Sequence, residues 1–301
     1  MTRRINLSNT ADYEIYIDAS LDLDYSWIEE NGIHIIPMKY VIDDKEYLMD
    51  RPQTEEELKI FYDKMRAGSI TGTSQITPYT YEQLFSEAAA QKKDILYLAL
   101  SSGLSSTYDS SLTGARAVME DHPDVRIECV DTLGGTGGMG LLLMLAIKAR
   151  KEGMSLSDNA AMLRDNALKV CYWFMVEDLI YLKRGGRISS TAALAGSVLN
   201  LKPVLKINDE GKLVNISKQR GVPRAVKYLL ECYQGAVDTA LENDVIVAHA
   251  DCRERAEKLA EEVRRINPAA RIQVCPMGPV IGAHTGPGFV AVIHFGNRNY
   301  R

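Results

Sequence analysis

Short apolar runs alternate with amphipathic segments in the first half of the chain. Residues 13–17, 33–42, 95–100 and 125–130 are rich in Ile, Val, Leu and Tyr, which is typical of strands. Between them, Thr54 and Glu57 form a capping-box pattern that predicts a helix ending at Gly68, and Pro78 marks the start of another. The alternation predicts a mostly parallel sheet covered by helices on both faces.

A second block of elements begins near residue 170. It contains a buried strand (170–176), a short helix (179–183), a hairpin (203–207 with 213–217), helices from Pro223 and Arg253, and strands near 245–248, 272 and 290. We therefore predict an α/β protein of two α/β domains, residues 1–165 and 166–301. The length of 301 residues agrees with two domains of about 150 residues each.

Composition narrows the function classes. The chain has 35 basic and 40 acidic residues, a net charge of −5, and this mild acidity argues against nucleic-acid binding. The five cysteines are scattered and three lie in apolar runs, which is typical of reduced thiols and predicts a cytoplasmic protein. The N-terminus has no apolar signal sequence, and the longest aliphatic stretch is far too short to span a membrane.

Two segments rich in hydroxyl groups precede predicted helices. They are GTSQIT at residues 72–77 and SSGLSST at residues 101–107. Backbone amides and the positive end of a helix dipole favour an anion at such places, although Ser and Thr also serve as ordinary helix caps. Both interpretations stay open for each segment taken alone.

Other signatures are weaker. Gly135 to Gly140 matches the G-x-G-x-x-G pattern, but a helix follows where a dinucleotide-binding unit requires a strand ending in an acidic residue. Close helix packing explains these glycines equally well. No G-x-S-x-G or P-loop sequence occurs, and His249 and Cys252 form an isolated pair without partners at zinc-ligand spacing, so we predict no metal site.

Two further segments combine glycine with a basic or titratable side chain. His284 lies in MGPVIGAHTGPG (277–288), which we expect to be a rigid loop in which the imidazole either binds an anion, accepts a proton or merely stabilises a turn. Arg187 belongs to KRGGRIS (183–189), where a helix C-cap with favourable cations is an equally good explanation.

These segments together resemble the DegV family of bacterial fatty-acid-binding proteins. Matching pieces occur in family order over nearly the whole chain: Asp18-Ala19-Ser20, Thr73-Ser74-Gln75, SSGLSST with Tyr108, Asp131-Thr132, KRGGRIS and GPVIGAHTGPG. The sequence departs from the family pattern at Ala19, Ile76 and Ser106. These departures leave the carboxylate-binding positions intact. They mean that the acyl-chain length preferred in the family is not carried over to this sequence.

The resemblance implies a long-chain fatty acid held in a cleft between the two domains. It assigns carboxylate binding to Thr73 and Ser102 and places His284 in the same polar network, and we add Ser74, Gly103 and Arg187 as supporting residues. It further implies a carrier without catalytic residues or a cofactor other than its lipid. Such a carrier presents the fatty acid to a separate fatty-acid kinase for acyl-phosphate formation and contacts membranes at most transiently.

One alternative of another class stays open. Ser102 or Ser105 with His284 as base is compatible with a hydrolase or acyltransferase, because the members of a catalytic triad have no fixed spacing in sequence. A nucleotide-binding enzyme using Gly135–Gly140 is a third, weaker hypothesis. For the acyl chain, the apolar candidates in the second block are Tyr172, Trp173, Phe174, Met175, Leu194, Val198 and Leu199.

Overall fold

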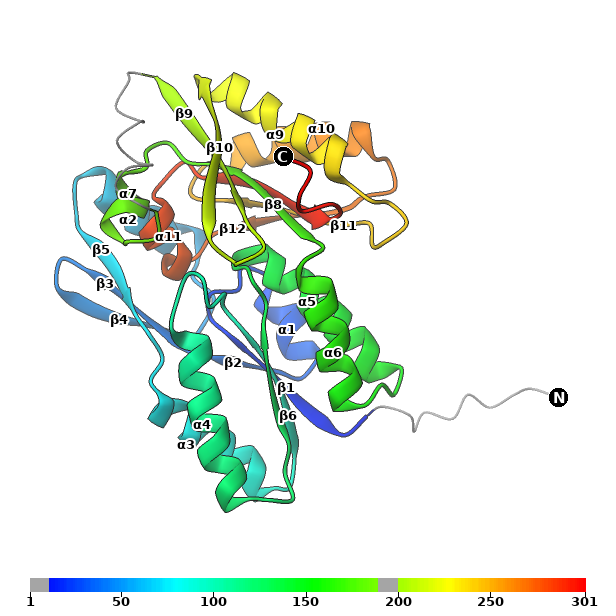
Figure 1. Ribbon diagram of the computed structural model, residues 1–301. Helices are drawn as coiled ribbons and strands as arrows, with labels where there is room; N and C mark the ends of the chain where they lie inside the picture. The colour runs from blue at the N-terminus through cyan, green and yellow to red at the C-terminus, as the bar shows by residue number, and fades with distance from the viewer. Residues whose placement is uncertain (1–10, 189–199) are drawn as a thin grey trace.

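The computed structural model describes residues 11–188 and 200–301 and contains three sheets (Figure 1). The first has four parallel strands in the order β2 (Ile33–Ile36), β1 (Tyr13–Asp18), β6 (Asp94–Ala99) and β7 (Ile127–Asp131). Helices α3 (Pro78–Ala90) and α4 (Thr107–Asp121) pack on one face, and α5 (Thr136–Lys151), α6 (Leu156–Ala167) and the short α1 (Tyr25–Glu30) lie on the other. The predicted parallel sheet flanked by helices is confirmed.

A small antiparallel sheet branches from the first one. Its order is β4 (Lys45–Met49), β3 (Met38–Ile42) and β5 (Thr71–Ser74), and α2 (Glu55–Arg66) follows β4 along the chain. The run 33–42 is therefore two strands in different sheets, separated at Pro37, whose ring cannot donate a ladder hydrogen bond. The predicted capping box at the start of α2 is present, with Thr54 and Glu57 each bonded to the other's backbone amide.

The second half forms a six-stranded sheet. Its order is β10 (Leu213–Arg220), β9 (Leu201–Ile207), β8 (Val170–Met175), β13 (Val290–Phe295), β11 (Asp244–His249) and β12 (Arg271–Pro276). Only β11 and β12 are parallel to each other among these described strands. Helices α9 (Val222–Ala236) and α10 (Arg253–Ile266) cover the outer face, while α7 (Ile180–Arg184) and α11 (Pro279–Thr285) lie near the small sheet (Figure 1).

Helix α5 joins the two halves. It is buried almost all round, because it packs against α6 on one side and against β8, β11 and β13 on the other. One apolar core consequently runs from Tyr13 to Phe295, and a second, separate core lies between the six-stranded sheet and α9 and α10. The boundary expected at 165 falls in the last turn of α6, and the division into two domains there stays a prediction.

Candidate functional site

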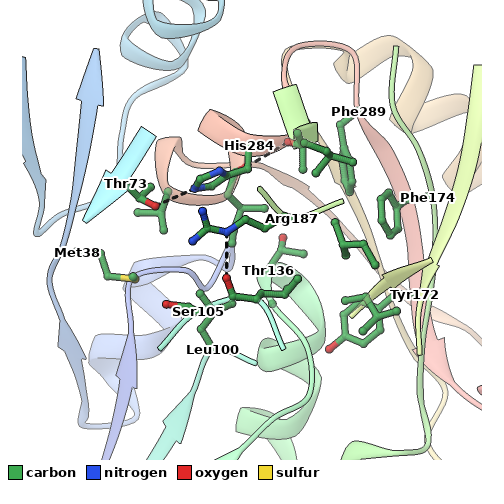
Figure 2. Close-up of a pocket in the computed structure, with 18 of the residues that line it drawn as sticks. Met38, Thr73, Leu100, Ser105, Thr136, Tyr172, Phe174, Arg187, His284 and Phe289 are labelled. Atoms are coloured by element: carbon green, nitrogen blue, oxygen red, sulfur yellow. Dashed lines mark hydrogen bonds between the residues drawn. The ribbon is translucent and has the colours of Figure 1, made fainter. Parts of the chain in front are cut away.

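A cavity of about 430 Å³ lies between the small sheet, the loops that follow β6 and β7 of the parallel sheet, and the inner face of the six-stranded sheet. Its two sides differ in chemistry (Figure 2). Polar groups of Thr73, Ser105, Arg187 and His284 gather on the side of the small sheet. The opposite side is apolar, and its wall includes Phe174 of β8 and Phe289 just before β13. This is the shape of site that suits a ligand with one polar end and a long apolar part.

The polar side is built around a hydrogen bond between Thr73 and His284. Thr73 lies on β5, and its Oγ1 is 2.8 Å from Nε2 of His284 on α11. Two residues earlier on the same strand, Thr71 donates its hydroxyl to the carbonyl of Ala283 at 2.8 Å, which holds α11 against β5. Residues 211 positions apart are therefore brought into direct contact by packing of α11 on the small sheet.

The imidazole of His284 is neutral at physiological pH. Burial and, to a smaller extent, the nearby positive charge of Arg187 together lower its pKa to about 4. Nδ1 is buried and has no partner among the described residues. An unpaired lone pair is less costly there than an unpaired N–H, so the proton belongs on Nε2, which then donates to Thr73 Oγ1. The Thr73 hydroxyl proton is thereby left to donate to a ligand.

Arg187 places a positive charge on this polar side. Its side chain is half-buried, Nε donates to the carbonyl of Leu104 at 3.0 Å, and Nη1 donates to the carbonyl of Gly185. Among the described residues no carboxylate pairs with it, and burial lowers its pKa. A guanidinium held by carbonyl groups and lacking a counter-ion is suited to meet an anionic ligand.

The serine-rich loop after β6 lies at the edge of the cavity. Ser102 is exposed and lines the cavity, with its amide donating to Asp131 at 3.2 Å. Ser74 also lines the cavity, whereas Gly103 does not. A side chain at Gly103 would overlap the carbonyls of Glu210 and Gly211, so the glycine permits close contact with the β9–β10 turn.

Two buried carboxyl groups hold segments next to the cavity in place: Asp18 bonds the end of β6, and Asp22 bonds the starts of two helices. Asp18, at the end of β1, accepts hydrogen bonds from the Leu100 amide (2.8 Å) and the Tyr97 hydroxyl (3.0 Å), and burial raises its pKa. Asp22 accepts from Thr136 Oγ1 (2.5 Å) and the Gly278 amide (2.7 Å), so it links the starts of α5 and α11, and burial raises its pKa to about 7.

The segment 277–288, which we expected to be a loop, contains a helix, and the segment 72–77, for which no element was predicted, contains part of a strand. Thr73 and Ser74 belong to strand β5, and His284 lies on helix α11. Helix α11 is followed by Gly286 as its C-cap, whose φ of 75° favours glycine. The motif residues were identified from sequence, but the elements that present them were not.

The candidates for the acyl-chain wall divide by strand alternation. Tyr172 and Phe174 face the cavity, whereas Trp173 and Met175 point to the opposite face of β8 and belong to the second core. Leu194, Val198 and Leu199 lie outside the described residues. Sequence reasoning missed four other lining residues: Ala291 and Ile293 of β13, Ile207 of β9, and Phe289, which precedes β13. For the strand residues, the alternation of inward and outward side chains was the available signal.

The glycines after β7 serve packing. Side chains at Gly137, Gly138 and Gly140 would overlap Ile246, Tyr172 and Leu23 respectively, so the glycines let α5 approach both sheets closely. The described residues contain no cluster of three or more His, Cys, Asp or Glu side chains that could hold a metal ion. In the same part of the chain, no helix has both the length and the apolarity needed to cross a bilayer.

Comparison with known proteins gives consistent relatives. The profile of the family described as "Uncharacterised protein, DegV family" matches residues 12–296. A DegV domain-containing protein of Clostridium perfringens is 39% identical over 285 residues, covering 95% of this chain and 98% of the relative.

Two solved structures extend the likeness to the fold. A DegV family protein from Thermus thermophilus, described for its fatty acid binding, has a TM-score of 0.83 at 26% identity, covering 95% of this chain and 99% of that one. DegV from Bacillus subtilis, described as a fatty acid binding protein, has a TM-score of 0.78 at 27% identity, covering 94% and 98%.

Proposed function

Because this chain belongs to the DegV family, we propose that it binds one long-chain fatty acid in the cavity between its two halves. The supporting observation is that the Thr73–His284 hydrogen bond and the Arg187 charge, which has no carboxylate partner among the described residues, lie on one side of a cavity whose opposite wall is largely apolar. The carboxylate accepts the Thr73 hydroxyl proton and lies near the Arg187 guanidinium. Ser102 supplies a further hydroxyl at the rim, and Ser74 and Gly103 support these groups.

The acyl chain lies along the inner face of β8 and β13. Burying each CH₂ contributes about 0.8 kcal/mol, so the tail supplies most of the binding free energy. Ordering of the chain and loss of its free motion cost a large part of that gain. The polar side then sets the orientation, because an ionised carboxylate buried without donors would be strongly unfavourable.

As a further part of the proposal, the protein is a carrier in the bacterial cytoplasm that presents its lipid to a separate fatty-acid kinase. This part rests on the family resemblance of the motifs and not on a contact seen in the structure. The hydrolase alternative is less well supported, because Nε2 of His284 bonds Thr73 instead of Ser102 and no carboxylate orients Nδ1 among the described residues.

Removal of the Thr73 hydroxyl tests the proposal. Thr73→Val keeps the shape of the side chain but deletes the donor to the carboxylate. A hydrogen bond to a charged group contributes about 1.5–3 kcal/mol, so we expect delipidated Thr73→Val to bind oleate or palmitate roughly 10- to 100-fold more weakly in a calorimetric titration.

Thr71→Val is the matched control, since its hydroxyl bonds the backbone of α11 and does not line the cavity. It should retain an affinity within about threefold of the native protein at a stability cost of about 1 kcal/mol. Equal affinities of Thr73→Val and the native protein would refute the carboxylate site. Turnover of an activated ester or acyl phosphate that disappears in Ser102→Ala would instead establish the hydrolase.

A further inference from the structure

A second cavity, of about 320 Å³, lies between α2 and the segments that follow β11 and β12. It lies at the carboxyl ends of β11 and β12, where His249 and Pro276 end these strands, and α2 covers it with Lys59 and Tyr62. Ligands in α/β proteins commonly bind at the carboxyl ends of parallel strands, and β11 and β12 are the parallel pair of this sheet. None of its lining residues also lines the fatty-acid cavity.

His249, which lines this cavity, has a buried donor without an acceptor among the described residues. His249 is only 4% exposed, and its Nδ1 lies 3.4 Å from the amide nitrogen of Cys252. An amide can only donate, so Nδ1 is the acceptor and the ring proton of the neutral imidazole is on Nε2. Burial lowers the pKa of His249 to about 4, which keeps the ring neutral at pH 7. Nε2–H is buried and has no partner among the described residues.

His294 on the adjacent strand β13 shows that burial alone does not leave a ring nitrogen without a hydrogen-bond partner. It is 1% exposed, and burial lowers its pKa to about 4 as well. Yet its Nε2 accepts from the indole of Trp173 at 3.0 Å and its Nδ1 lies 2.9 Å from the carbonyl of Phe295. Both ring nitrogens are thus satisfied. The unpaired nitrogen of His249 is specific to the ring that lines the cavity.

Charged groups of both signs lie near His249: Arg253 lowers its pKa, and the carboxylates of Asp251 and Glu55 raise it. Helix α10 begins at Arg253, and the side chain of its N-cap residue Cys252 accepts no hydrogen bond from the first amides. Those amides and the positive end of the helix dipole lie beside the carboxyl end of β11. Arg253 lines the cavity and pairs with Glu55.

Most carboxylates on this wall already have a cation. Asp251 pairs with Arg66 at 2.5 Å, and Lys59 of the same wall pairs with Asp63 at 2.7 Å. Glu55 and Glu56 lie in the first turn of α2, so a large anion near them would be repelled.

We propose that this cavity is a second ligand site, in which His249 Nε2–H, the first amides of α10 and Arg253 bind a small oxyanion, a phosphate or carboxylate group. The site is separate from the lipid cavity and does not depend on the proposed fatty-acid binding.

The direct test is an NMR titration of the full, folded chain with ¹⁵N-labelled histidine, using inorganic phosphate in one arm and acetate in the other. We expect at least one of them to shift the His249 ring signals saturably at millimolar concentration and to raise the pKa of His249, while the His294 signals stay unchanged. A response to phosphate alone assigns a phosphate group, and a response to both assigns a general oxyanion site. Absence of a saturable His249 shift in both arms would overturn the proposal.

A pair of variants separates the two ring nitrogens. In His249→Asn the side-chain oxygen can replace Nδ1 as acceptor for the Cys252 amide, but no group replaces Nε2–H. His249→Gln places an amide donor near the Nε2 position instead. The responding anion should bind about tenfold more weakly to the Asn variant and within about threefold of the native affinity to the Gln variant.

A native-like circular dichroism spectrum and cooperative thermal unfolding of both variants serve as the check on folding. Anion binding by folded His249→Asn that equals that of the native protein would refute the role of Nε2–H. Should the Asn variant not fold, the titration of the native protein still decides the proposal.

Discussion

Three histidines have their pKa lowered to about 4 by burial, yet they differ in what their ring nitrogens meet. Both ring nitrogens of His294 have partners. Among the described residues, His249 Nε2–H has no acceptor, and His284 bonds Thr73 through Nε2 while its Nδ1 has no partner. The partner of each nitrogen, and not burial, therefore separates a structural histidine from a binding one. Gly185 packs closely against Nδ1 of His284, and any side chain at position 185 would overlap the imidazole ring.

The pKa of His284 should report ligand binding. In delipidated protein we expect it to titrate near pH 4, and a bound carboxylate should raise this value because a negative charge favours the imidazolium. The folded pKa lies below the unfolded value of about 6.5. The neutral ring's contribution to stability is therefore complete above pH 6.5 and is lost as pH falls towards 4. Histidine NMR on free and oleate-bound protein checks this. Titration near pH 6.5 in the free protein would contradict the burial argument.

At the scale of elements, helix packing explains the glycines of residues 135–140, whose role their spacing alone does not reveal. The run Gly135–Gly140 fits the spacing of a dinucleotide-binding loop, but its glycines allow α5 to lie between two sheets. Nothing in the spacing distinguishes the two roles. The distinction comes from Ile246, Tyr172 and Leu23, which approach α5 from distant parts of the chain.

Gly137→Ala tests this packing role. Its Cβ would overlap the branched side chain of Ile246, which has little freedom to move aside. We expect the variant to lose about 1–3 kcal/mol of unfolding free energy in denaturant titrations. Gly72→Ala, on β5 with no atom within 4 Å of the added Cβ, is the matched control and should change stability little. If Gly137→Ala is as stable as Gly72→Ala, the close-packing interpretation is wrong.

Sequence patterns predicted most elements, and the failures have physical reasons. Strand β5 is only Thr71–Ser74, with no apolar residue to mark its alternation. Helix α11 has Gly282 in its middle and Gly-Pro pairs at both ends, a composition typical of a loop, although Pro279 at its first turn is a helix signal. The motifs brought Thr73, Ser102 and His284 together as candidates. Their geometry depends on packing of α11 against β5, which no local pattern records.

At the scale of the whole molecule, Asp22 connects the two halves of the chain through hydrogen bonds. It follows β1 of the parallel sheet and accepts hydrogen bonds from the starts of α5 and α11. Burial raises the pKa of Asp22 to about 7 from a reference value of 3.8. The folded state therefore favours the protonated form. This group's contribution to stability is complete below about pH 4 and is lost as pH rises towards 7.

The stability of Asp22→Asn relative to the native protein should consequently increase as pH rises. The amide keeps an acceptor for Gly278 and can donate to Thr136, but it carries no charge at any pH. Between pH 5 and 7, the unfolding free energy of Asp22→Asn relative to the native protein should increase by roughly 1 kcal/mol per pH unit. Urea titrations at several pH values measure the difference. A difference that is constant with pH would show that Asp22 does not titrate in this range.

The central claim concerns the contents of the cavity. Denaturing lipid extraction followed by mass spectrometry, on protein purified from bacterial cells, tests it most directly. We predict one long-chain fatty acid per chain, whose mass also reports the length of acyl chain that the apolar wall accepts. Protein that is empty and also fails to take up added palmitate or oleate would contradict the account.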